Sequence, residues 1–263
     1  MASPLLTTPP PPITAAALTH PGRARDQNED AFGAFVPDRL FIVADGMGGH
    51  NAGEVASQMA VDELAHFFRS FHDDPRQEWP YPVDRDRSLG ANLLMVGIKV
   101  ANQKVRAAAE AERSRSRMAC TVVAMAVGDN QISIAHAGDA RAYRLRGHEL
   151  KRLTTDHSIL AEMIAARPHM TEDEIAGFSH RNVVTKAVGS KADLDPSLYV
   201  GRFHRDDVFL LCSDGLWGAV KDHTIGDILS STSDLEAAGQ LLVDSANDAG
   251  GPDNVTVVLV RIG

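Results

Sequence analysis

The sequence has few of the residues from which zinc sites, disulfide frameworks and membrane spans are built. It has only two cysteines, Cys120 and Cys212, and each lies in an apolar, strand-like run. Neither a zinc-ligand spacing nor a disulfide framework is present, so we interpret them as small buried side chains in a reducing cytoplasm. No apolar run approaches the ~20 residues of a membrane-spanning helix, so no membrane association is expected.

Positive charge is also scarce. The 26 Lys and Arg residues are outnumbered by 35 Asp and Glu, which gives a formal net charge of −9 and argues against nucleic acid as a partner. The first residues carry no basic segment and no apolar core, so we expect no secretory leader. The prolines at 10–12 predict a flexible extended tail over residues 1–12, followed by a single domain over 13–263.

Hydrophobic periodicity predicts strands at both ends of the chain with pairs of helices between them. The predicted strands cover residues 13–18, 31–36, 40–44, 120–127, 131–136, 140–145, 149–153, 198–203, 208–212 and 255–262. The predicted helices cover residues 53–71, 89–112, 156–166, 224–229 and 235–247, with a further short helix from a capping box at Thr171. We interpret residues 120–153 as one antiparallel meander. The pattern predicts a single α+β domain with packed sheets and outer helices.

Several acids share one setting, because each lies where a predicted strand begins or ends. They are Glu29, Asp30, Asp45, Asp139, Asp214 and Asp253. If the strands pack side by side, their ends bring the acids to one spot, where carboxylates repel each other unless a cation lies between them. With no Cys or His among them, the ligands are all oxygens, which suits Mg²⁺ or Mn²⁺. Taken singly, each acid is better explained as a cap or turn residue, and spacing alone leaves their convergence open.

The stretch over residues 40–50 shows this setting most clearly. Asp45 ends an apolar run, and the glycines at 46, 48 and 49 follow it, which lets the backbone come close to a ligand. Two divalent ions at such a site can hold a bridging water, lower its pKa and present it to phosphorus. The site also needs a cation for the phosphoryl oxygens, and Arg25 or Arg23, shortly before Glu29, is the candidate.

Six stretches resemble the motifs of the metal-dependent protein phosphatase family (PPM, or type 2C) in its bacterial serine/threonine form. They are Arg25-Asp-Gln-Asn-Glu-Asp30, Val43-Ala-Asp-Gly-Met-Gly-Gly49, Ala137-Gly-Asp-Ala-Arg141, Leu153-Thr-Thr-Asp-His157, Leu211-Cys-Ser-Asp-Gly-Leu-Trp217 and Gly251-Pro-Asp-Asn-Val-Thr256. They occur in the family's order and cover nearly the whole chain. One such motif is a weak signal, whereas all six together are specific.

The resemblance implies a four-layer α-β-β-α sandwich of two antiparallel sheets flanked by helices, with two Mg²⁺ or Mn²⁺ ions at one edge. It also implies the ligands of these ions: Asp45 bridges them, the Gly46 carbonyl binds one, and Asp214 and Asp253 hold the other. Glu29 and Asp30 are expected to bind metal or orient its waters, and Asp139 and Asp214 to bind a weaker third ion. Arg25 is expected to hold the phosphate, while Arg23 is a surface residue. Residues 157–188 resemble the family's flap beside the active site.

The resemblance implies hydrolysis of phosphoserine and phosphothreonine in proteins by a metal-activated bridging water. The expected partners are a cognate serine/threonine kinase and its phosphorylated substrates, and the expected location is the cytoplasm. One alternative is a catalytically weak, phosphatase-like module that binds phosphoproteins, but the intact acids and Arg25 argue against it. The other is a metal phosphohydrolase for small phosphate esters or nucleotides, which no nucleotide-binding motif supports.

Three positions depart from the family pattern. Gly218 stands where the family often has an acid after Leu-Trp, which puts the third ion in doubt. Met47 stands where animal members have a histidine taken as the general acid; bacterial relatives commonly have Met there, and a metal-bound water is the remaining candidate. Ala119 replaces a glycine before the central strand, a mild change that we expect to be tolerated.

Overall fold

Two five-stranded antiparallel sheets stand face to face in the computed structural model, which describes residues 10–48, 52–74, 76–112, 115, 117–171, 174–175, 177–180 and 183–263. Sheet A has the order β1 (Ile13–His20), β10 (Val255–Ile262), β9 (Val208–Cys212), β6 (Arg141–Arg146) and β7 (Glu149–Arg152). Sheet B has the order β2 (Asp30–Phe35), β3 (Leu40–Met47), β4 (Ala119–Val127), β5 (Gln131–Ala137) and β8 (Ser197–Arg202). Most of the predicted tail lies outside the described residues.

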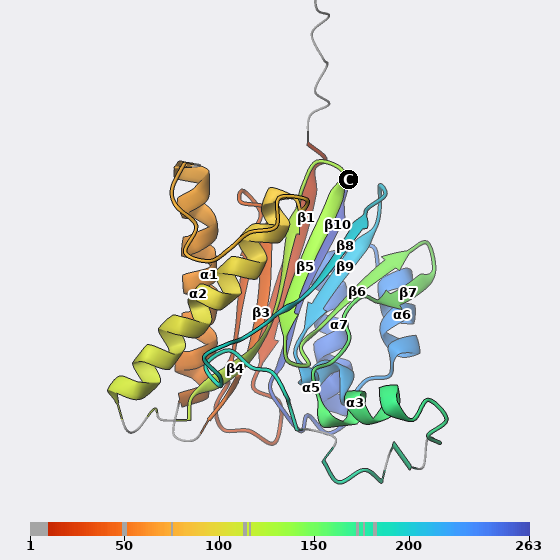
Figure 1. The fold of residues 1–263 in the computed structure, drawn as a ribbon. Helices are drawn as coiled ribbons and strands as arrows, with labels where there is room; N and C mark the ends of the chain where they lie inside the picture. The colour runs from red at the N-terminus through yellow and green to blue at the C-terminus, as the bar shows by residue number, and fades with distance from the viewer. Residues whose placement is uncertain are drawn as a thin grey trace, which may run out of the picture.

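Two pairs of helices cover the outer faces of the sheets (Figure 1). Helices α1 (Ala52–Asp73) and α2 (Leu89–Ala111) pack on sheet B, and α6 (Asp222–Ser231) and α7 (Leu235–Asp248) pack on sheet A. The short helices α3 (Ile159–Ala166) and α5 (Asp214–Trp217) lie at the lower end of the sandwich in Figure 1. The arrangement confirms the predicted α-β-β-α sandwich, and no helix among the described residues is long and apolar enough to cross a bilayer.

The hydrophobic core has three layers because both faces of each sheet are covered. Between the sheets, large side chains such as Phe41, Ile134 and Phe209 are buried. Alternate residues of the same strands, such as Ile42 and Leu210, face the outer helices instead. This explains why the central strands are nearly continuous apolar runs rather than alternating ones.

The predicted meander over residues 120–153 is wrong. Strands β4 and β5 pair in sheet B, whereas β6 and β7 pair in sheet A, and β6 pairs with β9 rather than with β5. The chain changes sheets at Gly138, whose φ of 112° is one that glycine adopts readily and other residues rarely do. A Cβ at this position would also lie only 2.4 Å from the Thr121 Cβ. The sheet change leaves Asp139 in the connection between the two sheets.

The start of one predicted helix differs in the structure. The helix predicted over residues 156–166 begins at Ile159, because Ser158 is its N-cap and its hydroxyl accepts a hydrogen bond from the Ala161 N–H. Asp156 is therefore outside the helix, and its carboxylate binds Arg141 of β6. The predicted short helix at Thr171 falls partly outside the described residues.

Candidate metal and phosphate site

The predicted acids converge at the end of the sandwich where α5 lies. A pocket of about 700 Å³ opens there. Of the predicted site residues, those that line it are Arg25, Glu29, Asp45, Gly46, Asp139, Asp214 and Asp253. They come from both sheets and from the connection between them, so the pocket exists only once the sheets have packed. The convergence that spacing alone left open is therefore present in the structure.

Asp30 lies beside this pocket rather than in its wall. It is the register partner of Asp45 in the β2–β3 pair, and its Oδ2 accepts a hydrogen bond of 2.7 Å from the Ser213 hydroxyl. Its Oδ1 is buried and has no partner within the described structure. Burial raises the pKa of Asp30 to about 7, against the lowering effect of the Thr256 and Ser213 hydroxyls.

Asp45 and Asp214 are the centre of the acidic group. Burial raises the pKa of Asp45 well above its usual value, and the charges of Asp30 and Asp214 raise it further. Burial and the charge of Asp253 raise the pKa of Asp214, while a hydrogen bond with Asp45 opposes that shift. Two neighbouring buried carboxylates repel each other, so a cation or a proton between them lowers the free energy of the site.

Asp139 approaches the pocket from the connection between the sheets. The residue is only 4% exposed, and burial together with the Asp214 charge raises its pKa to about 7. The Trp217 indole N–H donates to the Asp139 carbonyl at 3.0 Å. The acid is thus fixed through its main chain beside the pocket that it lines.

Arg25 stands at the rim of the pocket. Its Nη2 donates to Asp253 Oδ2 at 2.8 Å, and its side chain is 55% exposed. The hydrogen bond and the charge of Asp253 raise its pKa, so the guanidinium stays charged. Arg23 has the same 2.8 Å distance to Asp248, but both side chains are exposed and neither lines the pocket.

Asn254 organises the loop that carries Arg25 and Glu29, and the sequence analysis gave it no role. Its Oδ1 accepts from the Glu29 N–H at 2.8 Å, and its Nδ2 donates to the carbonyls of Pro21 and Gln27. The residue is only 6% exposed. Its position next to Asp253 within a matching motif was the available signal.

The donor set fits hard divalent ions. Carboxylates and the backbone around Gly46 supply only oxygen atoms, which suits Mg²⁺ and Mn²⁺. Across the described ranges, no three Asp, Glu, His or Cys side chains already form a group that could hold one ion. Mg²⁺ keeps several waters and needs only one or two carboxylates, so a wide ring of acids is compatible with it.

The three departures from the family pattern lie in different surroundings. Met47 lines the pocket, and its thioether has no proton to donate. Gly218 is exposed at the C-cap of α5 and is absent from the pocket wall. Ala119 is buried and pairs with Met47 at the start of β4.

Known proteins resemble this chain over most of its length. The family model for protein phosphatase 2C matches residues 22–251. The serine/threonine phosphatase stp of Listeria monocytogenes is 34% identical over 250 residues, covering 92% of this chain and 93% of the relative. The solved serine/threonine phosphatase PstP/Ppp of Mycobacterium tuberculosis has a TM-score of 0.82 and 32% identity, covering 95% of this chain and 98% of the other. The PstP catalytic domain in complex with 2 manganese ions has a TM-score of 0.80, with the same identity and coverage.

Proposed function

The chain belongs to the protein phosphatase 2C family and is a metal-dependent serine/threonine protein phosphatase; we propose that the acids around Asp45 hold its two Mg²⁺ or Mn²⁺ ions. The observation that carries the proposal is the convergence of acids from both sheets, with raised pKa values for Asp45 and Asp214, beside the Arg25 guanidinium. In the PstP structure with 2 manganese ions, a similar fold holds the same kind of ion.

The proposed role of each acid is the one that the family resemblance implies. Asp45 would be a ligand of both ions, the Gly46 carbonyl of one, and Asp214 and Asp253 of the other; Glu29 and Asp30 would bind an ion or orient its waters, and Asp139 would hold a weaker third ion together with Asp214. When bound, the ions supply a hydroxide nucleophile at neutral pH and neutralise phosphate charge. Asp45 and Asp214 are therefore the catalytic acids of the proposal.

Arg25 is proposed to bind the substrate phosphate. A guanidinium carries five N–H donors in a planar fork that matches two phosphoryl oxygens. One donor contacts Asp253, which holds the exposed side chain at the rim of the pocket. The acidic pocket alone would repel a phosphate dianion, so Arg25 and the ions together make binding of the phosphoprotein favourable.

The remaining parts of the proposal concern the domain, the partners and the location. Residues 13–263 are proposed to form one catalytic domain, with residues 157–188 as its flap, since the sandwich uses strands from β1 to β10. A cognate serine/threonine kinase and a cytoplasmic location are proposed, and the two free, buried cysteines are compatible with a reducing compartment. Cell fractionation that finds the protein outside the cytoplasm would contradict this location.

Phosphate release from a phosphothreonine peptide and from a nucleoside monophosphate tests the proposal. We expect turnover of the peptide with Mn²⁺ or Mg²⁺ and none with EDTA, because the ions generate the nucleophile. Peptide binding without turnover by the folded protein would indicate a phosphoprotein-binding module instead. Turnover of the nucleotide alone would indicate a small-ester phosphohydrolase.

A further inference from the structure

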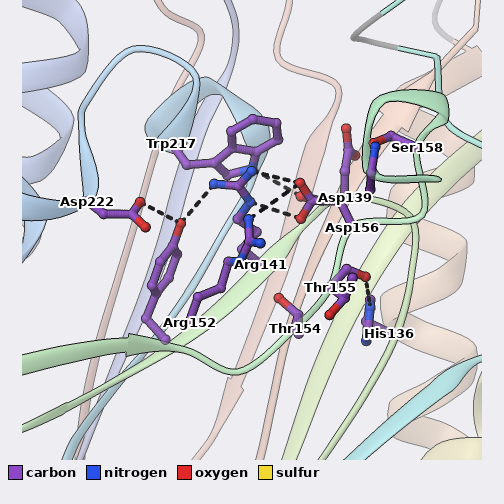
Figure 2. Close-up of polar contacts among 12 residues, drawn as sticks. His136, Asp139, Arg141, Arg152, Thr154, Thr155, Asp156, Ser158, Trp217 and Asp222 are labelled. Carbon is purple, nitrogen blue, oxygen red and sulfur yellow. Dashed lines mark hydrogen bonds and ion pairs between the residues drawn. The ribbon is translucent and has the colours of Figure 1, made fainter. Parts of the chain in front are cut away.

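Arg141, the first residue of β6, is enclosed by the side chains of Trp217, Tyr143 and Asp156, and we call this group of four side chains the Arg141 bracket. Its guanidinium carbon is 3.6 Å from the centroid of the Trp217 ring. Its Nε and Nη2 donate to the two oxygens of Asp156 at 3.0 and 2.7 Å, and its Nη1 donates to the Tyr143 hydroxyl at 3.1 Å. Figure 2 shows the indole over the guanidinium, with Asp156 and Asp222 on opposite sides. This set of contacts fixes the guanidinium plane.

The bracket reaches two of the acids of the pocket through Trp217. The indole N–H donates to the Asp139 carbonyl at 3.0 Å. Trp217 is also the last residue of α5, the single helical turn that begins at Asp214. One rigid side chain therefore joins the segment that carries Asp139 to the helix that carries Asp214. The guanidinium stacked on the ring sets the position of that side chain.

The bracket also reaches the start of the proposed flap. Asp156, which holds Arg141, is followed by His157, whose backbone N–H donates to the Gly138 carbonyl at 3.0 Å. The His157 Nδ1 in turn accepts from the Gly138 N–H at 3.1 Å. The residue before Asp139 is thus held on both sides by the segment that Asp156 anchors. A change in the Arg141–Asp156 pair is therefore transmitted to the main chain at Asp139.

The burial of Arg141 and Asp156 holds the two side chains in this one arrangement. The side chains of Arg141 and Asp156 are 12% and 11% exposed, and a buried arginine pair is held in place because either partner left alone would be an uncompensated charge. None of these side chains except Asp139 lines the pocket. They act on the site through the residues that do.

We propose that Arg141, Trp217 and Asp156 are positioning residues that set the separation of Asp139 and Asp214, and thereby the affinity for a divalent ion held between these two acids. The inference rests on the proposed function, because it requires that these acids bind an ion. Residues that orient metal ligands from outside typically change metal affinity by about 10- to 100-fold when they are replaced.

The test compares Trp217→Phe and Arg141→Lys with the wild type. Phenylalanine keeps a ring over the guanidinium but has no N–H for Asp139, and lysine keeps the charge but loses the fork that binds Asp156. Arg146→Lys is the matched control, since Arg146 makes the same forked pair with Asp207 at the other end of β6. Mn²⁺ binding is measured by calorimetric titration, and melting temperature in EDTA is measured alongside.

We expect Trp217→Phe and Arg141→Lys to weaken the lowest-affinity Mn²⁺ site by about 10-fold or more. Arg146→Lys should lower the melting temperature and leave every Mn²⁺ affinity within about twofold of the wild type, because it touches no pocket residue. Wild-type Mn²⁺ affinity in both Trp217→Phe and Arg141→Lys, with lowered melting temperatures, would show that these residues have a structural role only and would overturn the inference. A wild-type protein that binds no Mn²⁺ would overturn the proposed function first and the inference with it.

Discussion

Strand β6 carries an arginine–aspartate pair at each end, and the two pairs have nearly the same geometry. Arg141 donates to Asp156 at 3.0 and 2.7 Å, and Arg146 donates to Asp207 at 2.8 and 2.7 Å. Asp207 is 1% exposed and also accepts from the His204 N–H, so this pair holds the turn between β8 and β9. Arg141 instead stacks on Trp217 at the end where the acids converge.

The comparison shows that the geometry of an ion pair does not reveal its role. Both pairs are forked and both have a buried aspartate, so each stabilises its own connection. Only the pair with Asp156 belongs to a chain of contacts that ends at pocket residues. The two ends of β6 can therefore be separated by experiment, because replacements at one end should affect ion binding and those at the other only stability.

Asp214→Asn should cause the largest change in activity. The substitution removes a proposed metal ligand, so turnover of a phosphothreonine peptide should fall by more than about 100-fold. This exceeds the effect of about 10- to 100-fold that is typical when a residue that only orients a ligand is replaced. Asp207→Asn, at the end of β6 that lies away from the pocket, should keep its Mn²⁺ dependence while losing about 1.5–3 kcal/mol of unfolding free energy. Steady-state kinetics and urea unfolding measure the two effects. Full activity in Asp214→Asn would end the assignment of this acid.

Arg25→Ala should have the next largest effect. A charge-assisted hydrogen bond contributes about 1.5–3 kcal/mol, so kcat/KM for the peptide should fall about 10- to 100-fold. Calorimetric Mn²⁺ affinity should be affected far less, since Arg25 is a donor and not a ligand. An unchanged kcat/KM would show that another group binds the phosphate.

The stability of the ion-free protein should depend on pH through Asp30 and Asp139, two acids of the candidate site. The pKa values of Asp30 and Asp139 are raised to about 7, above the value of about 3.9 in an unfolded chain. Between these two values the folded state holds more protons than the unfolded chain. The contribution of these two acids to stability is therefore greatest at low pH and is lost as pH rises through about 7. Mn²⁺ replaces those protons and should raise the melting temperature more at about pH 8 than at about pH 5.5.

The control for this pH dependence is Asp139→Asn, which removes one of the two acids. Its melting temperature in EDTA should fall less steeply with rising pH than that of the wild type. Equal slopes for the two proteins would contradict a raised pKa at Asp139.

Arg23→Ala should have the smallest effect and so define the baseline for the comparison. Its partner Asp248 is as close as Asp253 is to Arg25, but both side chains are mostly exposed. Exposed pairs contribute about 0–1 kcal/mol, so unfolding free energy and kcat/KM should both stay near the wild type. A loss of kcat/KM like that of Arg25→Ala would move the phosphate contact to Arg23.

The sequence by itself pointed to the proposed metal ligands, because the signals for them are local. Asp45 follows a short apolar run and precedes Gly46, and Asp253 precedes the last strand, so both are recognisable without any knowledge of their neighbours. The central strands and the long helices α1, α2 and α7 were predicted for the same reason. Their periodicity is contained within each segment.

Only the tertiary structure decided how these segments are combined. The chain crosses from sheet B to sheet A at Gly138, because β6 pairs with β9, which is distant in sequence. No local pattern records such a partner, and the prediction of a meander was wrong for that reason. The same long-range pairing brings Arg141 under Trp217 and places Asp156 opposite it, so the contacts that hold Asp139 exist only after the two sheets and α5 have packed.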